Sequence, residues 1–161
     1  CSRHARQGMT AARNTLFRKG MTRMLSHTLV RRIEWGHCDP AGIVFNPNFF
    51  SFFDHCTAML YEAAGWPKDV MVETFGIAGC PLVDTRAKFM APSRYGEDVT
   101  IDSTIAEIHK SSFDNRHELS KDGKLRVEGY ETRVWTAKDP ETGRLKSTPL
   151  PDEVVARFRN G

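Results

Sequence analysis

Apolar and polar positions alternate with two different periods along this chain, and these periods predict one long helix and several strands. Apolar side chains spaced by four and three residues fall on one face of a helix. Asn46-Pro47 is expected to begin this helix and Gly65 to end it after about 17 residues, since Asn caps helices, Pro suits their first turn and Gly suits their end. The apolar stripe comprises Phe49, Phe53, Cys56, Leu60 and Ala63.

The side of this helix opposite the apolar stripe is polar, and the segment after the helix has no clear periodicity. Asp54, Thr57 and Tyr61 lie opposite the stripe, so they are expected to form the polar side of the helix. From Gly65 to Gly79 no clear period is present, and this stretch is expected to be irregular.

Alternation with a period of two predicts strands before and after the helix. Val99, Ile101 and Ile105 alternate with polar neighbours, and Asp122-Gly123 is a strong signal for the tight turn of a hairpin. A last amphipathic segment is expected to form a helix. The strands are predicted at residues 27–34, 81–90, 98–108, 112–120 and 124–137, and the last helix at residues 151–158.

The predicted order of elements is a strand, a long helix and then a run of antiparallel strands. This order is typical of an α+β domain with one helix on one sheet. One helix covers only one face of a sheet and leaves an edge strand unpaired. Such domains commonly join their sheets in symmetric oligomers, so a homodimer or homotetramer is expected.

Composition indicates one globular domain, because the 161 residues are 40% hydrophobic and 27% charged. The charge is uneven: residues 1–33 contain eight Lys or Arg and no acid, which leaves 15 bases and 20 acids in the remainder. We therefore expect a disordered basic tail over residues 1–24 and the folded domain over residues 25–161. The acidic body argues against a nucleic-acid partner, and the chain has no apolar run long enough for a membrane span.

Four cysteines, Cys1, Cys38, Cys56 and Cys80, lie far apart and form no CxxC pair. Disulfide frameworks and zinc knuckles need closer or paired spacing. Free thiols in a reducing compartment are the simpler interpretation, which predicts a cytoplasmic protein without a metal site.

The densest group of reactive side chains is found in residues 37–42, a loop that leads to the expected helix start. The first amides of a helix are unpaired and carry partial positive charge, so they suit an oxyanion. Pro47 has no N–H, which makes the backbone amides of Asn46 and Asn48 the candidate donors. Asp39, just before them, could attack an acyl group or activate water. Asp-Pro followed by Gly is also common in ordinary turns, and spacing alone favours this purely structural role.

The string IEWGHCDPAGIVFNPNFFSFFD, followed in order by GIAGCPLV and SFDNRH, resembles the 4-hydroxybenzoyl-CoA thioesterase family over about residues 27–137. The D-P-A-G-I-V string followed by P-N is the most specific part of the match. The resemblance implies a hot-dog fold, in which an antiparallel sheet wraps one long central helix. It also implies a dimer or tetramer that hydrolyses an acyl-CoA to a free acid and CoA. No cofactor is expected, because a thioester is already activated.

The resemblance assigns roles to five residues. Asp39 falls on the catalytic aspartate, as nucleophile or general base, and Asn46 falls on the position whose backbone amide polarises the thioester carbonyl. Asp54 falls on an aspartate at the acyl end of the pocket. His109 and Lys110 fall where the family has basic residues that grip the nucleotide phosphates of CoA. Each site is expected to draw on two chains, with these basic residues of one chain facing the catalytic aspartate of the other.

Acyl specificity is expected to differ from that of the family. The pocket should lie beside the polar side of the long helix, near Asp54, with residues 66–75 as a second wall. At or near Asp69, the family has a tryptophan that forms one wall of the aromatic acyl pocket. Because an apolar contact surface is lost there, we expect activity on several aromatic or medium-sized acyl groups without a strong preference for 4-hydroxybenzoyl.

Two other functions stay open. A hot-dog dehydratase acting on hydroxyacyl thioesters would use a His with a carboxylate, and His37 near Asp39 is the local candidate. A non-catalytic acyl-CoA-binding protein would not need a carboxylate beside an oxyanion site. Cys38 as a nucleophile is a weaker alternative, because no base is evidently paired with it.

Overall fold

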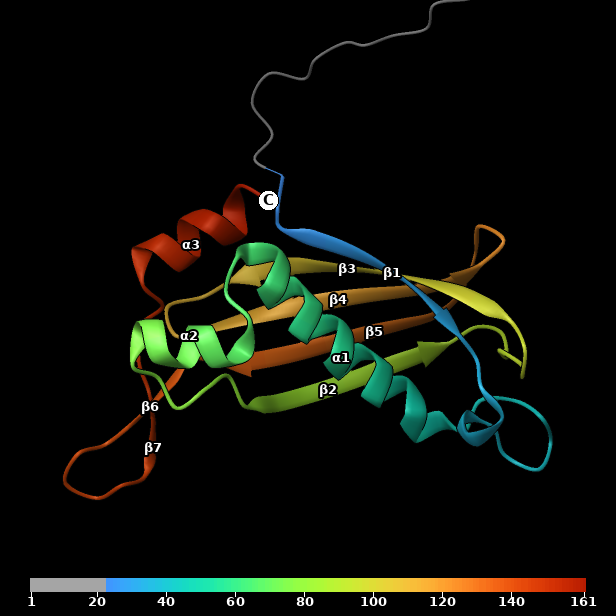
Figure 1. The fold of residues 1–161 in the computed structure, drawn as a ribbon, viewed down its shortest axis with the longest axis horizontal. Coiled ribbons are helices and arrows are strands. Elements are labelled where there is room, and N and C mark those ends of the chain that lie inside the picture. The colour runs from blue at the N-terminus through green and yellow to red at the C-terminus, as the bar shows by residue number, and fades with distance from the viewer. Residues whose placement is uncertain (1–22) are drawn as a thin grey trace, which may run out of the picture.

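Figure 1 shows the computed structural model of the chain, in which residues 23–161 are described. Its main layer is a five-stranded antiparallel sheet of order β1-β3-β4-β5-β2, and the long helix α1 lies across one face of it. The predicted α+β class is therefore confirmed. The elements are β1 (Ser26–Arg32), the 3-10 helix η1 (Trp35–His37), α1 (Asn46–Ala64), α2 (Lys68–Phe75), β2 (Leu82–Phe89), β3 (Asp98–Ile108), β4 (Ser112–Lys121), β5 (Lys124–Val134), β6 (Thr136–Lys138), β7 (Leu145–Ser147) and α3 (Asp152–Arg159).

Helix α1 starts differently from the prediction and ends where it was predicted. Asn46 is the first helical residue and not the cap, a position that Phe45 occupies. The first turn of the helix is held to the preceding loop, because the side-chain amide of Asn48 donates a hydrogen bond of 2.8 Å to the carbonyl of His37. At the other end Gly65 has a φ of 97°, in the left-handed region that glycine adopts without strain.

The buried face of α1 is wider than the apolar stripe. Thr57 and Tyr61 were predicted on the polar side, and this prediction is wrong: they are only 0% and 2% exposed. The Thr57 hydroxyl donates to the carboxylate of Glu131 on β5, and the Tyr61 ring packs edge-on against Phe113 on β4. The sheet thus satisfies the Thr57 hydroxyl, whereas the buried Tyr61 hydroxyl has no hydrogen-bond partner among the described residues.

Close packing between α1 and β5 depends on Gly129. The Phe53 ring of α1 lies over this glycine and stacks on His117 of β4, with ring centroids 4.9 Å apart. A Cβ atom at position 129 would overlap the Phe53 ring, which His117 keeps from moving aside. The missing side chain thus sets the distance between the helix and the sheet.

Gly129→Ala should lower the free energy of unfolding by about 1–3 kcal/mol, because overpacking forces side chains out of their preferred rotamers. Urea denaturation monitored by circular dichroism would measure the change. Gly36→Ala is the matched control, since no heavy atom lies within 4 Å of an added Cβ there. Equal stability of the two variants would contradict this account of the helix–sheet contact.

The segment between α1 and β2 is not irregular, and that prediction is wrong. It contains helix α2, in which Met71 is the buried residue. One buried position in eight residues gives too weak a period for recognition from the sequence. None of the helices within residues 23–161 has the length and apolar character needed to cross a membrane.

The predicted tail, residues 1–24, lies outside the described residues except for Arg23 and Met24. Met24, which falls in the predicted tail, packs against the core. The two ends of the described chain meet. The Gly161 amide donates to the Arg23 carbonyl at 2.9 Å, and the Leu25 amide donates to the Phe158 carbonyl at 2.8 Å.

Strand β2 is an open edge of the sheet. All its residues except Ala87 are exposed, including the apolar side chains of Leu82, Val83 and Phe89. An edge with free backbone groups and exposed apolar side chains is suited to pairing with another strand.

Candidate active site

Asp39 lies in a tight loop directly before α1. Its amide donates to the Ile43 carbonyl and its carbonyl accepts from the Gly42 amide, each at 2.9 Å. The Ala41 amide donates to Oδ1 of Asp39 at 2.8 Å. The half-buried side chain is therefore held through one carboxylate oxygen, while Oδ2 takes no part in this turn.

The start of α1 supplies an amide for an oxyanion. The Asn48 amide donates to the Phe45 carbonyl at 2.9 Å, which leaves Asn46, at the first helical position, as the better donor of the two candidates. Asn46 lines a cavity of about 260 Å³ together with Phe49, Phe89 and Ser93. The Ser93 hydroxyl is fully buried there and has no partner among the described residues. A buried hydroxyl of this kind needs a water molecule or a ligand atom as its partner.

His37 has a structural role in the same loop. The backbone amide of Glu34 donates to Nδ1 of His37 at 3.0 Å, and the imidazole packs edge-on against Phe52 with centroids 5.0 Å apart. The side chain is only 17% exposed. Cys38 is placed similarly, with its thiol donating to the Glu34 carbonyl at 3.7 Å. Neither contact pairs these side chains with Asp39.

Asp54 projects from the middle of α1 and is half exposed. Its Oδ1 accepts a hydrogen bond of 2.6 Å from Arg133 on β5, and its Oδ2 lies 3.9 Å from Nζ of Lys68 at the start of α2. Lys68 also lines a cavity of about 340 Å³ between α1 and α2, along with Tyr61, Met71 and Cys80. This cavity adjoins the segment 66–75, which was predicted as one wall of the acyl pocket, but Asp54 is not among the residues that line it.

Behind Asp54 lies a buried polar network that the sequence did not predict. Arg133 donates through Nε and Nη2 to Glu131, at 3.1 and 2.9 Å. The Thr57 hydroxyl donates to the same carboxylate at 2.7 Å, and Nε2 of His117 lies 3.7 Å from it. Burial alone would raise the pKa of the Glu131 carboxyl, but the interactions with His117, Arg133 and Thr57 outweigh burial and lower this pKa to about 2. Glu131 is therefore ionised at neutral pH.

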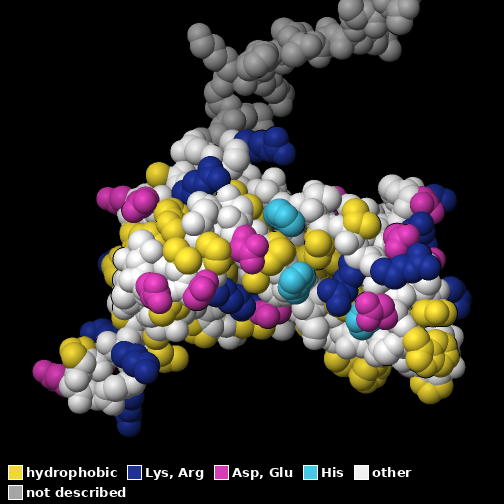
Figure 2. Space-filling model, in the orientation of Figure 1, with side chains coloured by type: hydrophobic (Ala, Val, Ile, Leu, Met, Phe, Trp, Pro, Cys, Tyr) yellow, Lys and Arg dark blue, Asp and Glu magenta, His cyan; other side chains and the backbone are white. Residues whose placement is uncertain are grey.

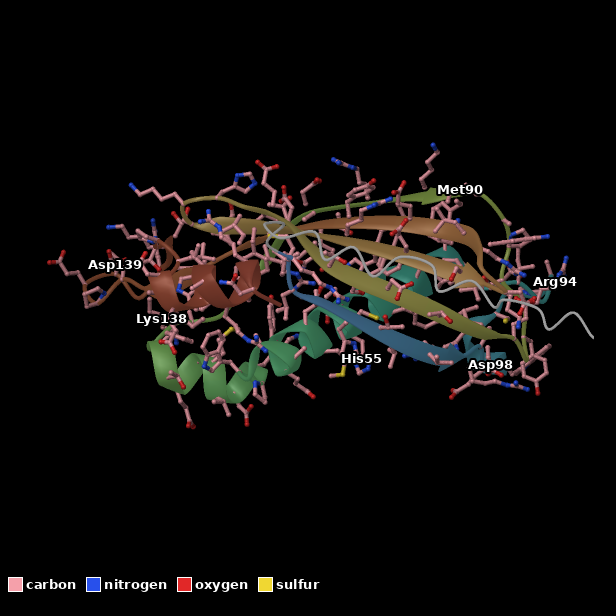
Figure 3. All side chains as sticks on the ribbon, turned by 90° about the horizontal axis from the view of Figure 1, so that it is seen from above. His55, Met90, Arg94, Asp98, Lys138 and Asp139 are labelled. Atoms are coloured by element: carbon pink, nitrogen blue, oxygen red, sulfur yellow. The ribbon has the colours of Figure 1, made fainter. Side chains whose placement is uncertain are left out.

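His109 and Lys110 are far from Asp39 within one chain. The Asp39 loop adjoins Ser93 and Arg94, close to the start of β3, whereas His109 follows the end of β3. Figure 3 shows Arg94 and Asp98 at one end of the sheet and Lys138 and Asp139 at the opposite end. The ten residue steps of β3 span about 33 Å. The Asp39 loop and the helix start at Asn46 thus lie near the start of β3, whereas the two basic residues lie beyond its end.

The surroundings of His109 differ from those of a free cation. Nε2 of His109 lies 3.2 Å from the Asp114 carboxylate, and Nδ1 lies 3.9 Å from the Glu107 carboxylate. These three side chains place potential ligand atoms within 4.8 Å of one another, the one such group found in residues 23–161 that could hold a metal ion. Lys110 beside them is exposed.

The fold and the Asp39 loop match known proteins. A model of the thioesterase-like superfamily matches residues 33–158. The chain belongs to this superfamily. A 4-hydroxybenzoyl-CoA thioesterase from Pseudomonas sp. (strain CBS-3) is 34% identical to it over 137 residues, which cover 81% of this chain and 95% of that protein.

Solved structures of thioesterases agree with this membership. One is an aspartate-to-asparagine mutant of 4-hydroxybenzoyl CoA thioesterase complexed with 4-hydroxybenzoyl CoA, with a TM-score of 0.76 and 31% identity over 83% of this chain and 99% of that chain. A gentisyl-coenzyme A thioesterase matches with a TM-score of 0.70 and 29% identity over 83% of this chain and 100% of that chain. The predicted hot-dog fold, family and thioester-hydrolase class are therefore confirmed. The roles of Asp39, Asn46, Asp54, His109 and Lys110 stay predictions.

Proposed function

We propose that this thioesterase hydrolyses an aromatic or medium-sized acyl-CoA to the free acid and CoA, with Asp39 as the reacting carboxylate. The observation that carries the proposal is the position of Asp39 in the loop before α1, whose first amide, at Asn46, lines a cavity. The related thioesterases act on aromatic acyl-CoA thioesters, as their names state, which supports this substrate class.

The geometry is compatible with two routes. In one, Oδ2 of Asp39 attacks the thioester carbonyl carbon and the Asn46 amide donates to the oxyanion that forms. The C–S bond then breaks, CoA leaves as a thiolate that takes a proton from water, and a second water opens the mixed anhydride and restores the carboxylate. In the other, Asp39 takes a proton from a water molecule that attacks the carbonyl directly, the C–S bond then breaks, and the proton passes from Asp39 to the leaving CoA thiolate. Neither route needs a metal or redox cofactor.

A thiol-trapping assay with a panel of acyl-CoA thioesters tests the proposal. The panel includes benzoyl-, 4-hydroxybenzoyl- and short aliphatic acyl-CoA, and release of CoA with an aromatic member is the expected result. A dehydratase would change a hydroxyacyl thioester without releasing thiol, and a binding protein would leave every thioester intact. The dehydratase is disfavoured because neither ring nitrogen of His37 is paired with Asp39: Nδ1 accepts from the Glu34 amide, and Nε2 lies 3.5 Å from Nη2 of Arg31.

The active unit in this proposal is a dimer or larger. Antiparallel pairing of two β2 edges would reverse the ends of the two sheets, which would set Asp39 of one copy at the same end as His109 and Lys110 of the other. Within a single chain the length of β3, about 33 Å, lies between these groups. Figure 2 shows apolar side chains gathered at the end of the molecule where α1 begins, and Trp35, Phe45 and Phe89 are exposed in this region.

Complementation tests whether two chains build one site. Lys110→Glu should raise KM about tenfold by repelling the phosphates, and Asp39→Asn should lower kcat. Co-expressed with separate affinity tags and purified through both, the two variants form mixed dimers in which one site combines intact Asp39 with intact Lys110. We expect such dimers to regain about half of the wild-type kcat at wild-type KM. A mixed dimer whose KM stays as high as that of the Lys110→Glu protein, or an active monomer in light scattering, would contradict the shared site.

We also propose a cytoplasmic location. Cys38, Cys56 and Cys80 are free thiols, which suit a reducing compartment. No nucleic-acid or membrane partner is part of the proposal.

A further inference from the structure

Ser93, in the connection between β2 and β3, has a buried hydroxyl without a hydrogen-bond partner in residues 23–161. The other serines and threonines that are buried in this part of the chain are all paired. Thr57 donates to Glu131 at 2.7 Å, Ser103 lies 2.7 Å from Nδ1 of His117, and Thr136 donates to a backbone carbonyl at 2.9 Å. An unpaired buried hydroxyl is unfavourable, so Ser93 is suited to a partner that binds from outside the chain.

The backbone fixes Ser93 beside the Asp39 loop. The Val44 amide donates to the Ser93 carbonyl at 2.9 Å. The adjoining residues of the two segments, Ile43 and Arg94, form an antiparallel bridge. The Ile43 carbonyl in turn accepts from the Asp39 amide at 2.9 Å. These contacts hold Ser93 at a defined position relative to the turn that carries Asp39.

The cavity of about 260 Å³ at the start of α1 is lined by both Ser93 and Asn46. Its other lining residues are apolar, and Phe49 and Phe89 are the largest of them. Figure 3 shows Met90, which also lines it, at the end of the sheet where Arg94 lies. The Asn46 amide and the Ser93 hydroxyl are thus two donors beside one mainly apolar space, in which hydrogen bonds are stronger than in water.

A thioester under nucleophilic attack suits a site with two donors. Attack moves the π electrons of the C=O bond onto the oxygen, whose lone pairs accept two hydrogen bonds. Donors that are already in place stabilise this charge without reorganisation, and serine hydroxyls act in this way as backbone amides do. Helix α1 offers the amide of Asn46, since Pro47 has no N–H and the Asn48 amide is bonded to the Phe45 carbonyl. A second donor therefore has to come from another element.

We propose that the Ser93 hydroxyl is this second donor, and that it bonds the thioester oxygen together with the Asn46 amide. This inference rests on the proposed thioesterase activity. In both routes Ser93 keeps its O–H bond and forms no bond to the acyl carbon. It stabilises the negative charge while that charge grows on the oxygen, and the charge disappears when the C–S bond breaks. Ser93 is a catalytic residue in this proposal, because its hydroxyl touches a reacting atom.

Two buried serines with opposite expected effects provide the test, using the acyl-CoA that the wild type hydrolyses fastest. Ser93→Ala should lower kcat at least tenfold, because loss of an oxyanion donor typically costs about 10²–10³ in kcat. It should change KM less than about twofold and leave Tm no lower, since no hydrogen bond within the described chain is lost. The control Ser103→Ala removes the contact with His117, so it should lower Tm by about 2–4 °C and leave kcat unchanged. Thiol release measures kcat and KM, and calorimetry measures Tm.

Three results with Ser93→Ala would overturn the inference and leave the proposed function intact. Wild-type kcat in the folded variant is one. A Tm lowered as in Ser103→Ala, or failure to fold, is another, because it would show a structural role for the Ser93 hydroxyl. A higher KM at unchanged kcat is the third, because it would show a contact with the bound substrate that does not strengthen during the reaction. If the wild type releases no thiol from any acyl-CoA, the proposed function fails and this inference fails with it.

Discussion

Asp39→Asn should reduce kcat by at least ~10²-fold while the protein stays folded and still binds acyl-CoA. The reason is that the substitution removes the proposed reacting carboxylate from the loop before α1 but keeps the local structure. Asparagine has the same shape, and its side-chain oxygen still accepts the hydrogen bond that the Ala41 amide now donates to Oδ1 of Asp39. Thiol release under saturating substrate measures kcat, and calorimetric titration with acyl-CoA measures binding.

A matched control separates the loss of one carboxylate from a general effect of charge. Glu141→Gln removes a charge in the exposed turn after β6, and it should leave kcat unchanged. The mechanism would be refuted by Asp39→Asn protein that retains its wild-type circular dichroism spectrum and turns over at the wild-type rate.

Glu131→Gln should lower the free energy of unfolding by about 3–5 kcal/mol at pH 7, the range found when one partner of a buried ion pair is removed. The Arg133 guanidinium, only 6% exposed, would lose its buried counter-ion. Glu118→Gln is the matched control, because Glu118 pairs with Arg116 at 2.9 Å but its side chain is 40% exposed. That variant should lose no more than about 1 kcal/mol.

The pH dependence of this difference follows from the pKa of Glu131. The folded protein lowers this pKa from 4.5 to about 2, so folding is favoured by the ionised form. The stabilisation is fully present above pH 4.5 and is lost as the pH falls toward 2. The difference between wild type and Glu131→Gln in urea denaturation should therefore shrink from pH 5 to pH 3. A difference that is constant over this range, or equal to that of Glu118→Gln, would show that Glu131 is not ionised in the core.

Local patterns predicted most of the elements. The alternation of Val99, Ile101 and Ile105 located β3, and all three are fully buried. Asp122 and Gly123 both have positive φ, as the predicted hairpin turn requires. Such signals depend on neighbours in the chain, so they can be recognised without knowledge of the tertiary structure.

Interactions between distant segments could not be predicted in this way. Thr57 was assigned to the polar side of α1 because the sequence does not show its partners Asn115 and Glu131, which lie 58 and 74 residues later. The same holds for the candidate site. Asp39 and Asn46 are close in sequence and were predicted together, whereas the pairing of Asp54 with a residue on β5 depends on how the sheet packs against the helix.

The contact between the two ends of the described chain has a consequence for how the fold opens. Strand β1 is held at its start by the last turn of α3, through the Leu25 and Gly161 amides, and Phe158 packs with Leu25 in the same core. Two backbone hydrogen bonds and apolar packing thus join the segment just before β1 to the segment at the end of α3, without a covalent bond. Fraying of α3 removes the support of the start of β1, and fraying of β1 removes that of α3, so we expect these two elements to open as one cooperative unit.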